Sequence, residues 1–443
     1  MDLSLSQSTK ALIAIAHPAF RDQLKYDARK AGLLNILKGG AIMDIFSGIR
    51  VIDITQFISG SRCTQILADM GAEVVKIEPP QGDTLRLIFS LMPGAERNYS
   101  ILNRNKYGLA LDWKKPQGQE IIRHLAATSD IFVHNLIPGT MENSHLGYED
   151  IRQVRPDIIY IAISGFGTTG INPERAAFDI IAQATSGHFW NDLENLMPPA
   201  NYWGDLVSGS YAAMAICMAL IHRMKTGEGQ YIDVSIQDVL YFNNYRAMID
   251  KAMAPMMDDV TRALGRKPAE VMNSKDRMPF YGFFKATDGK VAIVSVTPRQ
   301  WRDLSEIVNH PEMVTDPQFS NLIAQVNNHA AAVALIEEWT SRHTSAEIVR
   351  ILEDRKIPCG VAYSVDQVND DANLRARGMF QTVEHAQYGA IDVPGIPYHF
   401  SGTPGKINRP APGLGEHNQL LLEQWLGYTP DEIAQLKSTK IIT

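Results

Sequence analysis

Cysteine is scarce in this 443-residue chain, which contains only Cys63, Cys217 and Cys359. Three cysteines form too few disulfide bonds to stabilise a chain of this length. A disulfide scaffold is therefore excluded, and a reducing compartment is favoured. Long apolar runs are also lacking, since no uninterrupted stretch approaches the ~18 residues of a membrane span. The first residues lack a basic segment, so we expect no secretory signal. These absences predict a cytoplasmic protein without a membrane span.

A surplus of positive charge is absent as well. The chain has 42 Lys and Arg against 49 Asp and Glu, a net charge of −7. A dedicated nucleic-acid-binding protein normally carries a basic surplus, so we expect no nucleic-acid partner. The hydrophobic share of 45% and the charged share of 21% are those of an ordinary globular protein. The length predicts two or three domains.

Several motifs that carry chemistry are missing. No H-E-x-x-H or C-x-x-C spacing occurs, so we expect no metal site. No G-x-S-x-G motif occurs, so the chain lacks the turn that carries the nucleophilic serine of a serine hydrolase. The segment 165–170 does match G-x-G-x-x-G after a predicted strand, which is one feature of a dinucleotide-binding loop. However, Asn172-Pro173 follows at once and prevents a helix from opening there. We therefore interpret 165–170 as a tight turn.

The chain from Gly48 onward alternates strand-like and helix-like segments. Val51–Ile54 is a short apolar run, Cys63–Met70 is amphipathic and Val74–Ile77 is apolar again, which predicts a βαβ unit and a parallel sheet. Gly71 suits the left-handed conformation that ends a helix. The pattern continues with predicted helices at 117–127, 149–154, 206–225 and 237–252 and predicted strands at 131–133, 158–163 and 231–235.

The composition changes after Ala252. Residues 253–278 are rich in Met, Lys and Asp and predict a linker. Residues 279–296 have strand character with a turn at Asp288-Gly289. Helical patterns follow around 300–308, 329–340 and 345–355.

Asp205 stands between Gly204 and the predicted helix 206–225, and two interpretations remain open for it. An Asp before a helix is a preferred N-cap. The same carboxylate could act as a nucleophile, because Gly204 permits close approach of a ligand and the helix N-terminus favours negative charge.

A set of basic residues lies near the predicted strand ends, where ligands bind in open α/β folds. Any two could clamp phosphates, whereas each alone is by default a solvated surface charge. The set comprises Lys76, Lys106, Lys114, Arg86, Arg104 and Arg175.

From about Gly48 to the C-terminus, the chain resembles the class III CoA-transferases, the family that includes formyl-CoA, carnitine and bile-acid CoA-transferases. Several motifs occur together in the family's order. They lie at 48–53, 69–79 with Gly82-Asp83, 105–106, 134–139, 177–179, 204–209, 225–230, 357–360 and 415–417.

The resemblance implies an α/β fold, with a Rossmann-like large domain built on a parallel sheet, a smaller α+β domain, and two subunits interlocked like chain links. A homodimer is expected, although some relatives pair two different subunits. The implied organisation is an N-terminal extension at 1–47, the large domain at 48–252, a linker at 253–278, the small domain at 279–385 and a C-terminal segment at 386–443 that returns to the large domain.

The family's catalytic aspartate matches Asp205. The implied reaction transfers CoA from an acyl-CoA donor to a carboxylic acid, first through an acyl-aspartyl anhydride and then through an aspartyl-CoA thioester. CoA is therefore part of the substrate, and no tightly bound cofactor is implied. Positions that match the family's CoA-binding segments are Gln56, Phe57, Ile58, Ser59, Leu111, Lys114, Asn135 and Leu136.

Departures from the family pattern refine these expectations. Pro79 stands where some relatives place an Arg, which Arg104 or Arg175 would replace as a nucleotide contact. Related racemases place a His where this chain has Phe178, which favours transfer over racemisation. A non-catalytic partner subunit is a further alternative, which the presence of Asp205 disfavours.

The expected acid substrate is larger than oxalate. The Gly-rich loop of the oxalate-type enzymes is not visible between 253 and 300, and aromatic residues flank the motif around Asp205. These observations favour an aromatic, alicyclic or dicarboxylic acid. Phe178, Asp179, Trp203 and Gly204 are the expected substrate pocket, with Trp190 and Tyr202 as further aromatic candidates and core packing as the alternative for the aromatics.

Overall fold

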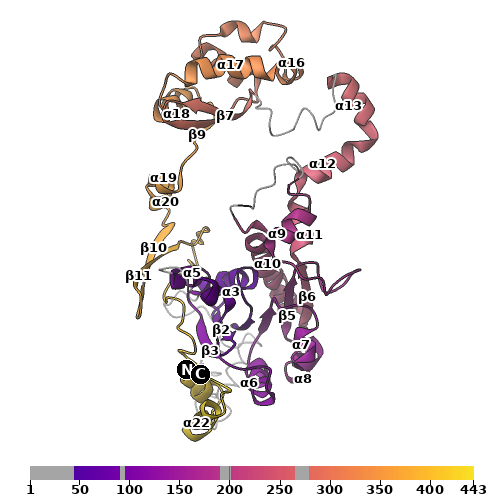
Figure 1. Ribbon diagram of the computed structural model, residues 1–443, viewed down its shortest axis with the longest axis vertical. Coiled ribbons are helices and arrows are strands. Elements are labelled where there is room, and N and C mark those ends of the chain that lie inside the picture. The colour runs from indigo at the N-terminus through magenta and orange to yellow at the C-terminus, as the bar shows by residue number, and fades with distance from the viewer. Residues whose placement is uncertain (1–43, 90–94, 190–198, 200, 265–278) are drawn as a thin grey trace, which may run out of the picture.

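The computed structural model describes residues 44–89, 95–189, 199, 201–264 and 279–443. Of the expected N-terminal extension, only 44–47 belong to the described residues, and Trp190 lies outside them. Figure 1 shows the large domain at one end of the molecule and the small domain at the other.

The large domain is built on six strands, all parallel, in the order β3-β2-β1-β4-β5-β6. Strands buried on both faces, such as β5 with the sequence IYIAIS, are typical of parallel sheets covered by helices. This sheet confirms the predicted α/β fold. The strands are β1 (Arg50–Ile54), β2 (Glu73–Glu78), β3 (Tyr107–Ala110), β4 (Ile131–His134), β5 (Ile159–Ser164) and β6 (Gln230–Ser235).

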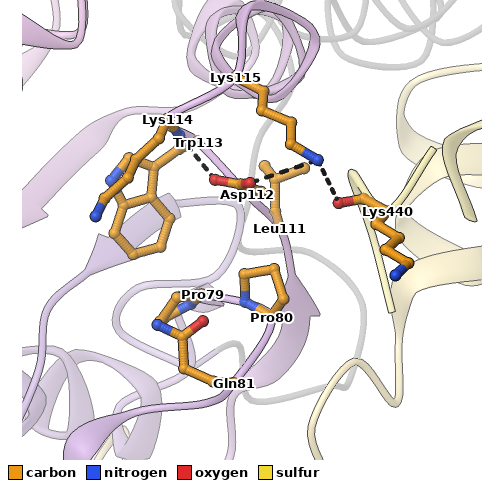
Figure 2. A pocket seen from close by; sticks show the side chains of 9 residues that line it. All are labelled: Pro79, Pro80, Gln81, Leu111, Asp112, Trp113, Lys114, Lys115 and Lys440. Atoms are coloured by element: carbon orange, nitrogen blue, oxygen red, sulfur yellow. Dashed lines mark hydrogen bonds and ion pairs between the residues drawn. The ribbon is translucent and has the colours of Figure 1, made fainter.

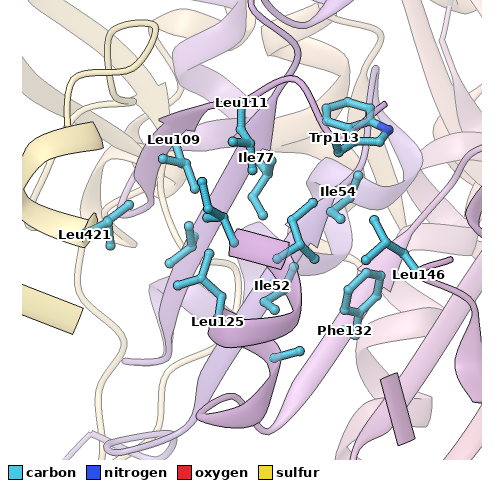
Figure 3. Close-up of a cluster of buried hydrophobic side chains, with 14 of the residues drawn as sticks. Ile52, Ile54, Ile77, Leu109, Leu111, Trp113, Leu125, Phe132, Leu146 and Leu421 are labelled. Atoms are coloured by element: carbon cyan, nitrogen blue, oxygen red, sulfur yellow. The ribbon is translucent and has the colours of Figure 1, made fainter. Parts of the chain in front are cut away.

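Helices cover both faces of this sheet. Alternate strand residues point to opposite sides, so each face carries apolar side chains that a helix layer must cover. Val51 belongs to one apolar layer and Ile52 to the other. Figure 3 shows the second layer, in which Ile52 and Phe132 of the sheet lie near Leu125 of a covering helix. The first layer contains α3 (Ser59–Asp69), α9 (Asp179–Thr185), α10 (Trp203–Thr226) and α11 (Ile236–Asn243). The second contains α6 (Pro116–Ala127), α7 (Thr140–Asn143), α8 (Tyr148–Val154), η3 (Leu421–Trp425) and α22 (Pro430–Ser438).

The C-terminal segment covers the outer edge of β3. Its His417 exchanges hydrogen bonds with the backbone of Gly108, and the Asn418 side chain accepts one from Ala110 N–H at 2.8 Å. The short helix α21 (Asn418–Leu420) and the bridge between Leu111 and Ile442 complete this cover. The edge strand is therefore not left open for pairing with another chain.

The small domain has its own apolar core around Phe284, Trp301, Trp339 and Ile348. Strands β7 and β8 pair as the hairpin expected from the Asp288-Gly289 turn. The elements of this domain are β7 (Tyr281–Ala286), β8 (Gly289–Val294), α15 (Pro298–Ile307), η2 (Pro311–Val314), α16 (Leu322–Asn327), α17 (His329–Thr340), α18 (Ser345–Asp354) and β9 (Cys359–Val361).

Two separate connections join the domains, as Figure 1 shows. Within the predicted linker, the described residues 254–264 are helical. The outgoing connection contains α12 (Tyr245–Met253), η1 (Ala254–Met256) and α13 (Met257–Leu264), and the returning one contains α19 (Val365–Asn369), α20 (Ala372–Ala376) and the hairpin β10 (Phe380–His385) with β11 (Gly389–Pro394).

Helix α10 is long and apolar enough, by length and composition alone, to cross a membrane. A helix in the core of a globular protein passes the same test. Its small residues, such as Gly209 and Ala212, are buried, and a Cβ on Gly209 would lie only 2.3 Å from the Ser59 carbonyl oxygen of α3. Close packing of this kind is what a core helix requires, and no other described helix passes the test.

Some elements differ from the predictions. Helix α3 begins at Ser59, four residues before the amphipathic stretch Cys63–Met70 that predicted it. The predicted helix 237–252 is broken at Asn244, whose side chain caps α12. Strand β3, helix α9, α4 (Thr84–Phe89) and α5 (Ala95–Asn103) were not predicted, because each is short and lacks a clear apolar period.

Candidate active site at the reversal of the sheet order

Two loops meet where the strand order reverses, between β1 and β4. Ligands of open α/β sheets bind in the crevice at such a position. The Asn135 side chain, just after β4, accepts a hydrogen bond from Gln56 N–H at 2.7 Å and donates to the Gln56 carbonyl, also at 2.7 Å. It also donates to Ser59 Oγ at 3.0 Å. Asn135 therefore fixes the loop 55–58 that follows β1.

Phe57 gives this loop an unusual shape, because its φ of 57° lies in the left-handed region. A bulky residue adopts that conformation only where its surroundings impose it. Asp83 accepts a hydrogen bond from Phe57 N–H at 3.2 Å, and the buried Lys76 ammonium contacts Asp83 at 3.1 Å and the Thr55 carbonyl at 2.7 Å. A buried ion pair thus holds the loop from beneath.

The buried charges form one network below the crevice. Lys106 contacts Asp53 at 3.0 Å, and Asp53 also accepts from Thr55 and Thr64. Burial alone would raise the pKa of Asp53, but the neighbouring Lys106 and Lys76 outweigh it and lower the pKa to about 2. The two lysines are completely buried. They are therefore neither phosphate clamps nor solvated charges, contrary to both expectations.

Two arginines from the same set are also structural. Arg104 is buried and pairs with Asp69 at 2.6 Å while its Nη1 donates to the Pro394 carbonyl. Arg86 binds Glu78 through two parallel hydrogen bonds of 2.7 and 2.8 Å. The expectation that Arg104 contacts the nucleotide is therefore wrong in this structure, because its guanidinium is engaged inside the protein.

Arg175 and Lys114 remain at the surface. The Arg175 guanidinium lies over the Phe166 ring at 4.5 Å from its centroid. Lys114 is exposed and lies two residues before α6 begins. Either can reach a ligand, and the roles given to them by the resemblance stay predictions.

The loop after β1 is linked to Asp205 through aromatic and polar contacts. The ring of Phe57 packs edge-on against that of Phe178, with centroids 5.4 Å apart. Phe178 precedes Asp179, the first residue of α9. One Asp179 carboxylate oxygen accepts a hydrogen bond from Asp205 N–H at 3.1 Å, and the other accepts from Gln183 at 2.6 Å. Asp179 and Gln183 are both buried.

Asp205 is the third residue of α10, and the N-cap position belongs to Tyr202. The N-cap interpretation of Asp205 is therefore wrong, because the helix begins earlier than predicted. Instead, Asp179 satisfies a free N–H group of the first turn from outside the helix. Burial, and secondarily the Asp179 carboxylate, raise the pKa of Asp205 to about 7. The Asp205 side chain is still partly exposed.

Gly204 allows these two carboxylates to approach one another. A Cβ at position 204 would lie 2.8 Å from Asp179 Oδ1 and 3.0 Å from Ile236 Cγ2. A larger residue would force Asp179 away from Asp205 N–H. The sequence singled out Gly204 for ligand access, whereas the structure shows that it also permits internal packing.

Aromatic side chains at Asp205 are exposed rather than packed in the core. Phe178 is 64% exposed, and Tyr202 and Trp203 are each 54% exposed. Core packing is therefore not their role in the single chain. They surround the start of α10 with an apolar surface that an acyl group or another subunit can cover.

A pocket of about 390 Å³ lies over the ends of β2 and β3, as Figure 2 shows. Apolar walls come from Leu111 and Trp113 together with the prolines that follow β2. Positive charge comes from Lys114, Lys115 and Lys440. The sequence pointed to Leu111 and Lys114 only, because Lys440 comes from the far end of the chain. The complete lining is Pro79, Pro80, Gln81, Leu111, Asp112, Trp113, Lys114, Lys115 and Lys440.

The turn at 165–170 is the tight turn that the sequence favoured. Gly167 and Gly170 have φ values of 86° and 107°. The Asp233 carboxylate accepts a hydrogen bond from Thr168 N–H at 2.8 Å. An acidic group already occupies the backbone donor that a pyrophosphate would need, and no helix begins there among the described residues until Asp179.

Metal chemistry has no visible site in the part of the chain that the structure describes, where no three His, Cys, Asp or Glu residues gather. His134, next to Asn135, is buried, and burial lowers its pKa to about 4. Its ring packs edge-on against Tyr160 at a centroid distance of 5.4 Å.

Comparisons with known proteins agree with the motifs and the fold. The chain is 31% identical over 402 residues to succinyl-CoA:glutarate CoA-transferase of Homo sapiens, with 89% of each chain covered. It is 32% identical over 406 residues to formyl-CoA:oxalate CoA-transferase of Streptomyces avermitilis, with 89% of this chain and 98% of the relative covered.

Solved structures show the same architecture. A CAIB/BAIF family protein from Brucella suis superposes with a TM-score of 0.71 at 27% identity, with 86% of this chain and 99% of that chain covered. A hypothetical protein, Rv3272, from Mycobacterium tuberculosis superposes with a TM-score of 0.72 at 26% identity, with 86% and 100% covered. The family model described as CoA-transferase family III matches residues 46–418. The chain therefore belongs to CoA-transferase family III, whose members transfer CoA between an acyl-CoA and a carboxylate.

Proposed function

We propose that this chain transfers CoA through covalent intermediates on Asp205. The observation that carries the proposal is the placement of this carboxylate. It stands in the first turn of α10 beside the crevice loops, and a hydrogen bond from its own N–H to Asp179 fixes its backbone. Because the helix N-terminus stabilises nearby negative charge, it supports both the carboxylate and an oxyanion formed on it.

The reaction consists of acyl-transfer steps that leave Asp205 unchanged at the end. The Asp205 carboxylate attacks the donor thioester carbonyl, the C–S bond breaks, and CoA thiolate and an acyl-aspartyl anhydride form. The thiolate attacks the aspartyl carbonyl and releases the donor acid, leaving an aspartyl-CoA thioester. The acceptor carboxylate attacks that thioester, which frees the thiolate and forms a second anhydride between Asp205 and the acceptor. Finally, the thiolate attacks the acceptor acyl group and restores the Asp205 carboxylate.

Ionisation of Asp205 sets the pH dependence of this sequence. A pKa of about 7 means that about half of the free chains carry the nucleophilic carboxylate near neutral pH. The rate at low donor concentration is expected to rise as the pH increases through 7. Exclusion of water by the bound substrates protects the anhydride from hydrolysis.

We propose that CoA binds with its nucleotide in the lysine-rich pocket, the one lined by Lys114, Lys115 and Lys440, and with its thioester at Asp205. Leu111 and Trp113 offer apolar walls to the adenine, and the lysines around them offer charge to the phosphates. From there, the pantetheine arm would follow the loop 56–59, whose last residue begins α3, toward the crevice. This path joins the positions that match the family's CoA-binding segments.

For the substrates, we propose succinyl-CoA as the donor and a dicarboxylic acid larger than oxalate as the acceptor. Two curated relatives support this proposal by name, succinyl-CoA:glutarate CoA-transferase and succinyl-CoA--D-citramalate CoA-transferase. The similarly related formyl-CoA:oxalate CoA-transferases supply the alternative. A screen of succinyl-CoA and formyl-CoA against glutarate, larger acids and oxalate distinguishes them. Turnover with oxalate alone would contradict the proposal.

We further propose that two copies of the chain pair over the apolar side of α10. Solvent-exposed apolar side chains recur every three or four residues along that helix, which gives one continuous stripe. They are Met214, Met218, Ile221 and Met224. A second copy would also cover Phe178 and Trp203. A different subunit remains an outcome of the test, since one relative is named an alpha subunit.

Sedimentation velocity distinguishes these assemblies. We expect the purified chain to sediment as a dimer, and a monomer with no transferase activity would indicate a missing second subunit.

The cysteines in the described residues, Cys63, Cys217 and Cys359, are free thiols, which supports the proposed cytoplasmic location.

The test of the nucleophile is Asp205→Asn. The amide keeps the shape of the side chain but cannot form the anhydride, so we expect turnover to fall by at least about a thousandfold. Asp233→Asn is a matched control, because Asp233 lies in the turn contact with Thr168. Wild-type turnover by Asp205→Asn would contradict the proposal.

A further inference from the structure

The C-terminal turn forms part of the lysine-rich pocket. Asp112 N–H donates to the Ile441 carbonyl at 2.8 Å, and Leu111 forms a bridge with Ile442. Lys115 Nζ donates to the carbonyls of Thr439 and Lys440 at 3.2 and 3.0 Å. Four residues near the end of the chain, 439–442, are thus attached to the segment 111–115 that lines the pocket.

Lys115 and Lys440 have different roles in this arrangement. The Lys115 ammonium is engaged by the two carbonyls and by Asp112 at 3.7 Å. Lys114 and Lys440 are exposed, and among the described residues no hydrogen bond or ion pair engages either ammonium. Figure 2 shows them on opposite sides of the pocket. Two uncommitted cations therefore flank the apolar walls.

The backbone at Lys440 is unusual for a lysine. Its φ is 54°, and Ile441 N–H donates to the Leu436 carbonyl at 2.9 Å, which closes the end of α22. Glycine is the common residue where a helix ends in the left-handed conformation, because a side chain is disfavoured there. A lysine at this position costs conformational energy, and an outlier of this kind points to a role for its side chain.

The sheet order indicates which phosphate Lys440 meets. The pantetheine arm must leave the pocket toward β1, because the loop 56–59 and Asp205 lie there. Lys440 belongs to the segment that covers β3, two strands away on the outer side. In CoA, the pyrophosphate leads to pantetheine, whereas the 3′-phosphate projects separately from the ribose. A cation on the outer wall therefore suits the 3′-phosphate.

We propose that Lys440 binds the 3′-phosphate of CoA and makes the site select CoA over 3′-dephospho-CoA. This role replaces, from the C-terminal end of the chain, a positive charge that some relatives place at the position of Pro79. The inference rests on the proposed function, since it assumes that this pocket holds the nucleotide of CoA.

The test compares CoA and 3′-dephospho-CoA by titration calorimetry on the full chain and on Lys440→Gly. Glycine adopts a positive φ without strain, so the variant is expected to unfold at the same temperature as wild type or higher. CoA should bind about five- to tenfold more weakly to the variant, as for loss of one charged hydrogen bond. Binding of 3′-dephospho-CoA should change by less than about twofold.

Lys437→Ala is the matched control. Lys437 is an exposed lysine in the last turn of the same helix and does not line the pocket. The variant removes the same charge as Lys440→Gly, but at a position outside the pocket. Both ligands should therefore bind as they do to wild type. Equal weakening of both ligands by Lys440→Gly, no weakening of either, or the same effect from Lys437→Ala would overturn the assignment of Lys440. Failure of the wild-type chain to bind CoA would overturn the proposed function itself.

Discussion

The raised pKa of Asp205 has a consequence for stability that can be measured without substrate. In an unfolded chain the carboxyl titrates near its ordinary value of 3.8, whereas in the fold it titrates at about 7. Between these values the folded state binds the extra proton. Stability contributed by this group is therefore present below about pH 4 and is lost as the pH rises through 7.

The size of the effect follows from the pKa difference. Each pKa unit corresponds to about 1.4 kcal/mol, so the difference of about three units sets an upper limit of about 4 kcal/mol. Residual solvent contact of the side chain reduces the cost of the charge, and we expect about 2–3 kcal/mol. Asp205→Asn removes the titration, so the variant should be more stable than wild type by this amount at about pH 8.5 but by only about 1 kcal/mol at about pH 4.5, where the carboxyl is ionised in most unfolded chains and protonated in the fold.

Urea unfolding at the two pH values measures the difference directly. Comparing the variant with wild type cancels the titration of all other groups. The combination of higher stability at alkaline pH with lost turnover would show that Asp205 is kept at a cost to the fold. The reasoning would be refuted if the variant were less stable than wild type at about pH 8.5. It would also be refuted if the stability difference between variant and wild type were the same at both pH values.

Three further predictions concern the groups around this carboxylate. Asp179→Asn removes a nearby negative charge but keeps an oxygen that accepts from Asp205 N–H, so the rising limb of the pH–rate profile should move below pH 7; an unmoved limb would contradict the coupling. Gly204→Ala places a methyl group 2.8 Å from Asp179, and we expect at least about a tenfold loss of kcat with about 1–3 kcal/mol of destabilisation in urea unfolding; full activity would contradict the packing argument. Asp53→Asn leaves two buried ammonium groups underpaired, so the free energy of unfolding should fall by about 3–5 kcal/mol; a change below about 1 kcal/mol would show that the network is dispensable.

The central part of the fold could be predicted because its residues carry strong local patterns. The run from β1 through α3 to β2 alternates apolar strands with an amphipathic helix, and the structure has all three elements in place. Helix α9 could not be predicted, since seven residues do not establish a period. Its first residue, Asp179, nevertheless accepts a hydrogen bond from the N–H group of Asp205 in the first turn of α10.

The ion pairs were harder to predict from the sequence than the helices and strands. A basic residue near a strand end suggests a ligand contact, but its acidic partner comes from elsewhere in the chain. Lys106 meets Asp53, and Arg104 meets Asp69, across 53 and 35 residues. No local pattern encodes such pairs. For the same reason, Lys440 could not be assigned to the pocket at Leu111.

Formation of a covalent intermediate on Asp205 is the central claim, and mass spectrometry tests it most directly. The chain is incubated with succinyl-CoA without acceptor acid, quenched and digested, and the peptide that contains Asp205 is analysed. We expect that peptide to gain the mass of CoA less one water, or the corresponding product after hydroxylamine treatment, and we expect no such change in Asp205→Asn. An unmodified Asp205 peptide from a chain that turns over succinyl-CoA, or a modification on a different residue, would contradict the account.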